Sequence, residues 1–171
     1  MSAVLASTQT IGRFELIREL GRGAQGTVHL ARDPHLDRLV AIKALRLSGD
    51  TKDRAQRMSL LMQEARLVSK LHHPNIVTLF DAVEHQGAPC LVFEYVEGRP
   101  LSDVVVASER LPATQIVDIA IGILRGISFA HGKKVLHRDI KPANVMLTAA
   151  GTPRVMDFGI ACEASAAPLS E

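Results

Sequence analysis

Residues 137–144, with the sequence HRDIKPAN, place an aspartate, a lysine and an asparagine close together, and a second aspartate, Asp157, follows. Pro142 disfavours a regular helix through the first stretch, so we expect a loop there. Carboxylate and amide oxygens are ligands that suit Mg²⁺, which keeps waters and substrate phosphates in its shell. The pattern predicts that Asn144 and Asp157 hold Mg²⁺ beside a phosphate-bearing substrate.

The remaining polar residues of this stretch suit phosphoryl transfer. That reaction needs little covalent help from a protein, but it needs in-line positioning and neutralisation of charge on the transferred group. We expect Asp139 to orient an attacking hydroxyl and to accept its proton. Lys141, two residues on, would neutralise the terminal phosphate.

A glycine-rich stretch, GRGAQG at residues 21–26, fits the spacing GxGxxG. Dinucleotide-binding folds share this spacing, but there the last glycine opens a helix. Residues 27–30 instead continue as an alternating strand, so Gly21, Gly23 and Gly26 are predicted at a hairpin tip. Missing side chains let backbone N–H groups approach phosphate oxygens closely. A plain hairpin turn is the alternative interpretation of the stretch taken alone.

Two charged residues interrupt apolar patterns. Lys43 ends the run VAIK, and alternation puts it on the face of Ala41 and Leu45. Glu64 falls within the apolar arc of a predicted helix, where an unpaired charge is costly. We therefore expect Lys43 and Glu64 to pair and to hold the amine toward phosphates. Two independent side chains at a lobe edge are the alternative.

The elements that would position these residues divide into two halves. Strands are predicted first, with one helix among them, and then a linker leads to a mainly helical half. Predicted strands cover residues 14–20, 27–32, 39–45, 76–83 and 89–96, helices cover 53–71, 101–108 and 113–131, and a small hairpin covers 145–148 and 154–156. The long helix has one apolar stripe and further apolar residues outside it, so it expects partners on more than one side. The stripe consists of Ile116, Ile119, Ala120, Ile123, Leu124 and Ile127.

Together these motifs resemble, in order and over residues 14–161, the protein kinase family, in particular the bacterial eukaryotic-like (Hanks-type) Ser/Thr kinases. HRDIKPAN followed by DFG at residues 157–159 carries most of the resemblance, and Lys141 indicates the Ser/Thr class. The resemblance implies an α+β, two-lobed fold with a five-stranded antiparallel N-lobe sheet and one main helix. We expect a flexible leader at 1–11, the N-lobe at 12–97 and a partial, mainly α C-lobe at 98–171.

The resemblance also implies ATP between the lobes, with Mg²⁺. It assigns the nucleotide to Leu20, Gly21, Gly23, Gly26, Val28, Ala41, Lys43, Phe93, Glu94, Val96 and Met146. Val28, Ala41 and Met146 would sandwich the adenine, Phe93 would be the gatekeeper, and the backbone of Glu94 and Val96 would bond the adenine edge. Val68, Leu79, His137 and Phe158 would stack as a spine, and Arg138 implies tuning by activation-loop phosphorylation.

Two departures from the family pattern appear. Gln25 stands at the loop tip, where the family often has an aromatic or large apolar residue. After residue 161 only a short Ala/Ser/Pro tail follows, without an APE motif or later helices. An exposed long helix would forfeit roughly 1.5–3 kcal/mol per large apolar side chain. We therefore expect another lobe or a second copy to cover it, or the chain alone to be marginal and inactive.

Composition narrows the partners. The 171 residues are 47% hydrophobic and 22% charged, with a net charge of +2, which gives no indication of nucleic-acid binding. Two cysteines without a disulfide framework favour a reduced, cytoplasmic setting. The segment 116–130 contains Asp118 and Arg125 and is expected to be too short and too charged to span a bilayer. A tether elsewhere in a longer protein is compatible with this sequence.

Three functions follow as hypotheses. The first is a Ser/Thr protein kinase that transfers the γ-phosphate of ATP to protein hydroxyls, present as an incomplete catalytic domain. The second is a non-catalytic kinase-like module that binds a nucleotide or a partner. The third is a small-molecule kinase of related fold, which Arg138 and the string Lys141-Pro142 disfavour.

Overall fold

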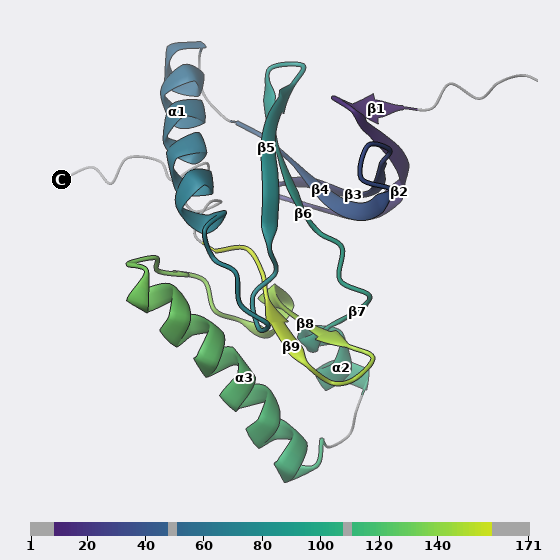
Figure 1. Cartoon of the computed structure of the whole chain (residues 1–171), viewed down its shortest axis with the longest axis vertical. Helices are drawn as coiled ribbons and strands as arrows, with labels where there is room; N and C mark the ends of the chain where they lie inside the picture. Colours follow the sequence, from purple (N-terminus) through teal and green to yellow (C-terminus); the bar gives the residue numbers. More distant parts are fainter. Residues whose placement is uncertain (1–8, 48–50, 108–110, 159–171) are drawn as a thin grey trace, which may run out of the picture.

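The computed structural model describes residues 9–47, 51–107 and 111–158. Within them the chain forms an α+β, two-lobed structure with a curled antiparallel sheet above and a mainly helical part below (Figure 1). The upper lobe contains β1 (Thr10–Ile11), β2 (Phe14–Gly23), β3 (Gly26–Asp33), β4 (Arg38–Leu45), α1 (Thr51–Val68), β5 (Leu79–His85) and β6 (Ala88–Glu94). The lower lobe contains β7 (Gly98–Pro100), α2 (Leu101–Ala107), α3 (Ala113–Gly132), the 3₁₀ helix η1 (Pro142–Asn144), β8 (Val145–Thr148) and β9 (Pro153–Val155).

The upper sheet has six strands in the order β1-β2-β3-β4-β6-β5, one more than the sequence predicted. The additional strand is β1, whose Ile11 pairs with Phe14 and is buried with it against one face of the sheet. β1 thus lies within residues 1–11, the range predicted to be a leader before the lobe. Residues 1–8 of the expected leader and 159–171 of the expected lower lobe lie outside the described residues.

Alternation along β4 gives the sheet two different faces. Val40 and Ile42 point to a core cluster with Phe14 and Val92. Ala41 and Leu45 point to the opposite face, where α1 contributes Leu61, Ala65 and Val68 to the main core. Because side chains alternate along a strand, Lys43 must emerge on the α1 side. There it is only 8% exposed.

The lobes are joined by backbone pairing as well as by the chain. Residues before β5 run beside β9: the N–H of Val77 donates to the Val155 carbonyl and the N–H of Val155 donates to the Asn75 carbonyl, both at 2.8 Å. The buried Asn75 side chain also donates to the Pro153 carbonyl at 2.9 Å. These hydrogen bonds hold β9, and hence Asp157 two residues beyond it, against the upper lobe.

The long helix α3 packs through glycine more than through its predicted apolar stripe. A Cβ on Gly122 would lie 2.4 Å from Pro153 Cγ, and a Cβ on Gly126 would lie 3.1 Å from the Asn75 carbonyl oxygen. Of the predicted stripe, Ile119 is buried, whereas Ile116 and Leu124 are exposed. The stripe was therefore partly wrong, because close backbone contact requires small residues that an apolar pattern does not single out.

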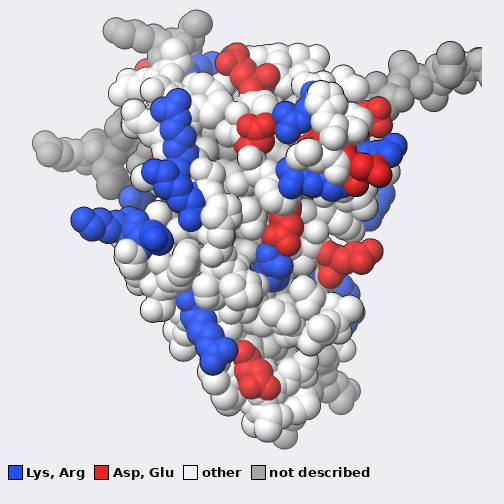
Figure 2. Space-filling model, viewed as in Figure 1, with Lys and Arg blue, Asp and Glu red and all other residues white. Residues whose placement is uncertain are grey.

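By length and composition alone, α3 is also long and apolar enough to cross a membrane. At 20 residues it is not too short, which corrects the sequence argument on length. Core helices of proteins that never enter a membrane have the same length and composition, so these two properties are only weak evidence for a membrane-spanning helix. In Figure 2 the lower part of the molecule, where α3 lies, is mostly white, whereas charged side chains gather over the upper part.

Candidate active site

Two adjoining cavities lie between the lobes, under the β2–β3 hairpin. One is polar, about 410 Å³, and reaches from the hairpin tip to Asp139 and Asn144. The other is mainly apolar, about 360 Å³, and reaches to β6 and the segment that follows it. Gly21, Val28, Lys43 and Asp157 line both cavities. The two therefore form one continuous cleft with an apolar side and a polar side.

The glycine-rich stretch forms the predicted hairpin, with Gly23 opposite Gly26 in the β2–β3 ladder. Gly26 has φ +149°, and a Cβ there would lie 2.0 Å from the Ala44 carbonyl oxygen. Only glycine fits this position, because both the backbone angle and the space exclude a side chain. Gly21 and Gly23 face open space on the cleft side. At Gly21 and Gly23 the hairpin thus presents backbone without side chains to the polar cavity.

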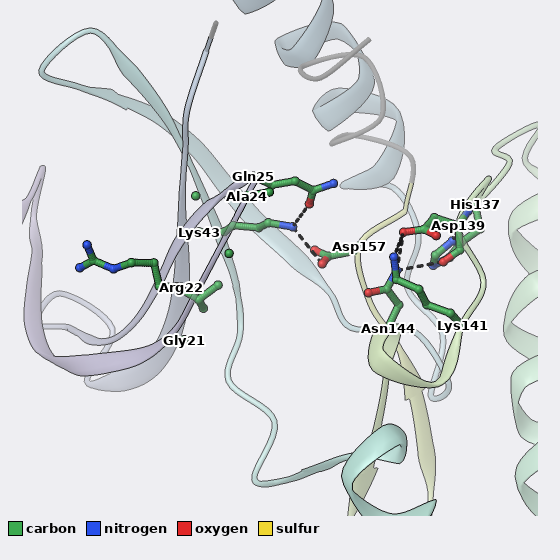
Figure 3. Close-up of a pocket in the computed structure, with 13 residues that line it drawn as sticks. Gly21, Arg22, Ala24, Gln25, Lys43, His137, Asp139, Lys141, Asn144 and Asp157 are labelled. Carbon is green, nitrogen blue, oxygen red and sulfur yellow. Dashed lines mark hydrogen bonds and ion pairs between the residues drawn. The ribbon is translucent and has the colours of Figure 1, made fainter. Parts of the chain in front are cut away.

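Lys43 reaches into the polar cavity, but its partners differ from those predicted. Its ammonium lies 2.9 Å from Asp157 Oδ2 and donates to Gln25 Oε1 at 3.1 Å (Figure 3). Among the described residues, Glu64 instead lies 3.6 Å from Arg138 Nη1. The predicted Lys43–Glu64 pair is therefore wrong for this structure. The ammonium instead pairs with the carboxylate of Asp157, and the Glu64 carboxylate pairs with Arg138.

Asp139, Lys141 and Asn144 form one hydrogen-bonded group on the opposite wall. Lys141 Nζ donates to Asp139 Oδ2 at 2.6 Å, and Asn144 Nδ2 donates to the same carboxylate and to the Asp139 carbonyl. The hydrogen bond from Lys141, helped by Asn144, lowers the pKa of Asp139 despite some desolvation. Asp139 is therefore ionised at neutral pH and able to accept a hydrogen bond from a hydroxyl.

His137 positions this loop from below. It is 2% exposed, its Nε2 donates to the Met156 carbonyl at 2.8 Å, and its Nδ1 accepts the Asp139 N–H at 3.2 Å. One donating and one accepting nitrogen describe the neutral ring. Burial lowers the pKa of His137 below its ordinary 6.5, which agrees with that assignment. The ring also stacks on Phe158 with centroids 4.7 Å apart.

Asp157 stands where the two walls meet. Its backbone is left-handed, with φ +60°, a conformation that aspartate tolerates better than most residues. This turn directs its carboxylate toward Lys43 (Figure 3). Asn144 lines the same cavity, and its amide nitrogen faces Asp139, so its amide oxygen is directed away from that carboxylate. Oxygen donors from Asp157 and Asn144 fit a divalent cation that completes its shell with phosphates and water.

The apolar cavity gathers the residues predicted for the adenine. Those that line it are Leu20, Gly21, Val28, Ala41, Phe93, Glu94, Val96 and Met146. The Glu94 N–H, however, already donates to the Thr78 carbonyl at 2.9 Å. Of its two backbone groups, only the carbonyl is a candidate for the adenine edge. Sequence reasoning missed Val77 and Met156, which also line this cavity.

A further missed residue is Arg154 on β9. Its guanidinium forms an ion pair with the Glu94 carboxylate and donates to the Ile76 carbonyl at 2.9 Å. Both side chains are mostly buried, 17% and 29% exposed. The pair therefore ties the lower lobe to the end of β6, beside the apolar cavity. No sequence signal marks it, because its two charges lie 60 residues apart.

The predicted spine residues come together. Val68, Leu79 and Phe158 belong to the same buried core cluster, and His137 packs on Phe158. The spine therefore runs from α1 through β5 to the loop before Asp139. Gly159, the last residue of the DFG string, lies outside the described residues.

Comparisons with known proteins point in one direction. A family model described as "Protein kinase domain" matches residues 14–170. The chain is 43% identical over 155 residues to serine/threonine-protein kinase PksC of Streptomyces coelicolor, covering 86% of this chain and 28% of that protein. It is 36% identical over 167 residues to serine/threonine-protein kinase PrkC of Bacillus subtilis, covering 98% and 26%.

The solved structures agree. The crystal structure of the Mycobacterium tuberculosis PknI kinase domain matches with a TM-score of 0.80 and 29% sequence identity, covering 92% of this chain and 62% of that one. This chain thus spans about a quarter of the length of the curated relatives, and under two thirds of a solved kinase domain.

Proposed function

The chain belongs to the protein kinase family, of the Ser/Thr type found in bacteria, and we propose that it carries the nucleotide-binding and catalytic part of a protein kinase. The reaction is transfer of the γ-phosphate of ATP to a serine or threonine hydroxyl of a protein. We propose that residues 12–97 and 98–171 belong to its two lobes. The supporting observation is the convergence of Lys43, Asp139, Asn144 and Asp157 on a single cavity that opens into an apolar pocket.

The apolar pocket suits the adenine. Val28 and Ala41 on the upper lobe and Met146 on the lower lobe line the cavity, as does Phe93, the proposed gatekeeper. The Glu94 carbonyl and the Val96 backbone would bond the adenine edge. Gly21, Gly23 and Gly26 would cover the phosphates with backbone N–H groups, and Leu20 would cover the outer face of the adenine.

The polar pocket suits the triphosphate. Lys43 would hold the inner phosphates, and Asn144 and Asp157 would hold Mg²⁺. When bound, the metal would neutralise charge on the phosphates and fix their position. Asp139 accepts a hydrogen bond from the substrate hydroxyl and takes its proton as the new P–O bond forms and the bond from the γ-phosphorus to ADP breaks. Lys141, 2.6 Å from Asp139 here, would turn to the transferred phosphate.

One observation supports a second candidate, a non-catalytic nucleotide-binding module. In active kinases the strand lysine pairs with the helix glutamate, whereas here Glu64 lies against Arg138 and Lys43 against Asp157. We propose that this is a resting arrangement and that Glu64 turns to Lys43 when the phosphates arrive. Arg138 would then be released to meet a phosphorylated activation segment.

The partners follow from the same reaction. A protein substrate with serine or threonine is implied, and the exposed apolar residues of α3, among them Ile116, Val117, Ile121 and Leu124, are proposed to be covered by a further kinase lobe or a second copy. We propose no nucleic-acid partner and a cytoplasmic location for the site, since it uses ATP.

Radiolabelled phosphate transfer tests the proposal. The purified chain, with Mg²⁺ and γ-labelled ATP, should label casein on serine or threonine, and Asp139→Asn should reduce the rate at least about 100-fold while leaving ATP binding within about twofold. Tight ATP binding without transfer by the wild-type chain would favour the non-catalytic module. Equal rates for wild type and Asp139→Asn would contradict the assigned role of Asp139.

A further inference from the structure

Gln25, at the tip of the glycine-rich hairpin, is the one residue there whose side chain enters the polar cavity and bonds the predicted phosphate-binding lysine, within the part of the chain that the structure describes. Its amide oxygen accepts a hydrogen bond from Lys43 Nζ at 3.1 Å. Figure 3 shows the Lys43 ammonium between the Gln25 amide and the Asp157 carboxylate. Neither the metal ligands nor the proton acceptor of the proposed reaction require this contact.

The backbone around Gln25 is fixed. Its carbonyl accepts the Arg46 N–H at 3.0 Å, and Gly26 leaves no space between the hairpin and the Ala44 carbonyl. The hairpin tip is thus anchored to the end of β4, the strand that carries Lys43. Gln25 and Lys43 therefore both belong to the upper-lobe sheet, and the backbone contacts that place Gln25 beside β4 involve no residue of the lower lobe.

The ammonium has three N–H donors. Gln25 takes one and Asp157 takes another, at 3.1 and 2.9 Å. Among the described contacts none takes the third donor, so it is left for a phosphate, and it stays so if Glu64 takes the place of Asp157 beside Lys43. Glu64, the acceptor expected from the family pattern, lies beside Arg138 in this structure.

From this geometry we propose that Gln25 is a positioning residue for nucleotide binding: it holds the Lys43 ammonium in the polar cavity so that the free N–H meets the triphosphate. The inference rests on the proposed function, because it assumes that phosphates enter this cavity. A neutral amide suits the task, since it orients a cation without adding a negative charge that would repel phosphate.

A double-mutant cycle tests the proposal, with affinities for ATP and for adenosine measured by calorimetry on the purified chain. Gln25→Met keeps the length of the side chain and removes the acceptor. We expect it to weaken ATP binding about fivefold, as for one hydrogen bond to a partly exposed charge. Adenosine binding should stay unchanged, because adenosine has no phosphate for Lys43 to hold.

The dependence on Lys43 is the decisive comparison. In a Lys43→Met background, Gln25→Met should change ATP affinity by less than about 1.5-fold, since there is no ammonium left to orient. Gln56→Met, the same change at an exposed position of α1, is the matched control and should have no effect in either background.

The outcomes separate the possibilities. An equal loss in both backgrounds would mean that Gln25 touches the phosphate itself, which overturns a role through Lys43. Unchanged or tighter ATP binding by Gln25→Met would also overturn it, the latter by showing that the contact competes with phosphate. If the wild-type chain binds ATP no better than adenosine, it is the proposed function that fails, and the Gln25 inference falls with it.

Discussion

The apolar and polar sides of the cleft are built in different ways, although the β2–β3 hairpin lines both. The apolar side is made largely of strand residues whose positions are set by alternation in a packed core. Beside it, the mostly buried Glu94–Arg154 ion pair connects the two lobes. The polar side is made of charged side chains of unequal exposure, from Lys43 at 8% to Asp139 and Lys141 at 42% and 51%. Packing fixes the first, while exchangeable ion pairs set the second.

This difference predicts which ligands each side can sense. Changes on the apolar side should alter binding of the nucleoside and the nucleotide alike, because both use the same slot. Changes on the polar side should alter only ligands that carry phosphate. The ratio of ATP affinity to adenosine affinity therefore reports the polar side separately from the apolar side.

Replacing Lys43 with methionine should give the largest effect. It removes the cation of the polar cavity and leaves the Asp157 carboxylate without its 2.9 Å partner, close to where phosphates would lie. We expect ATP affinity to fall about 100-fold, or ~2.7 kcal/mol, with adenosine affinity unchanged, as measured by calorimetry. An equal loss for both ligands would mean that the two sides do not act separately.

Replacing Arg154 with methionine should destabilise the fold that supports the apolar side. It leaves the partly buried Glu94 carboxylate without its guanidinium, at a cost of roughly 1–3 kcal/mol, between the values for exposed and buried pairs. Chemical denaturation measures this loss. Arg154→Lys should recover part of it, and so should adding Glu94→Gln to Arg154→Met. No recovery in either variant would show that the ion pair with Glu94 is not the source of the stabilisation.

Enlarging Ala41 to leucine should narrow the apolar cavity directly. The added carbons occupy part of a space of about 360 Å³. We expect ATP and adenosine each to weaken about tenfold, or ~1.4 kcal/mol, so that their ratio stays constant. Parallel titrations of the two ligands measure the ratio. A changed ratio would place Ala41 against the phosphates instead of the adenine.

Lowering the pH should reduce the free energy of unfolding through protonation of His137. We expect this to be the smallest of the four predicted effects. The neutral His137 accepts the Asp139 N–H, and burial lowers its pKa below 6.5. Below about pH 6.5 the unfolded chain then binds the proton and the folded chain does not, so the free energy of unfolding should fall as pH drops toward the lowered pKa. His137→Gln, which cannot titrate, should show a flatter pH dependence in denaturant titrations from pH 7.5 to 5.5.

The matched control for that measurement is His131→Gln, at an exposed position near the end of α3. It should keep the wild-type slope. Asp139, whose pKa is lowered by Lys141, contributes stability that is lost only as pH falls below about 3.8, outside this window. An unchanged slope in His137→Gln would contradict the assignment of the neutral ring.

Much of the fold could be predicted from the sequence because its signals are local. Alternation along β4 placed Lys43 on the α1 face, and the continuing strand after Gly26 placed the glycines at a hairpin tip. The string HRDIKPAN with the following Asp157 located one wall of the cleft. The edge strand β1 was missed because two residues carry too little pattern to identify a strand.

What failed were pairings between distant side chains. Glu64 was paired with Lys43 because each is a charged residue within an apolar pattern. Such a pattern does not indicate which of several nearby charges forms the more stable ion pair. The free-energy differences among partly exposed pairs are about 1 kcal/mol or less. Arg154 was missed for the same reason, since an isolated arginine on a short strand has no sequence feature that identifies its partner as Glu94.

The central claim is that the polar side of the cleft binds a metal-bound triphosphate, and its most direct test is calorimetric titration of ATP and adenosine with and without Mg²⁺. We predict that Mg²⁺ tightens ATP binding at least about tenfold and leaves adenosine unaffected, and that Asp157→Asn removes most of this Mg²⁺ effect. Equal affinities for ATP and adenosine, whether or not Mg²⁺ is present, would contradict the claim.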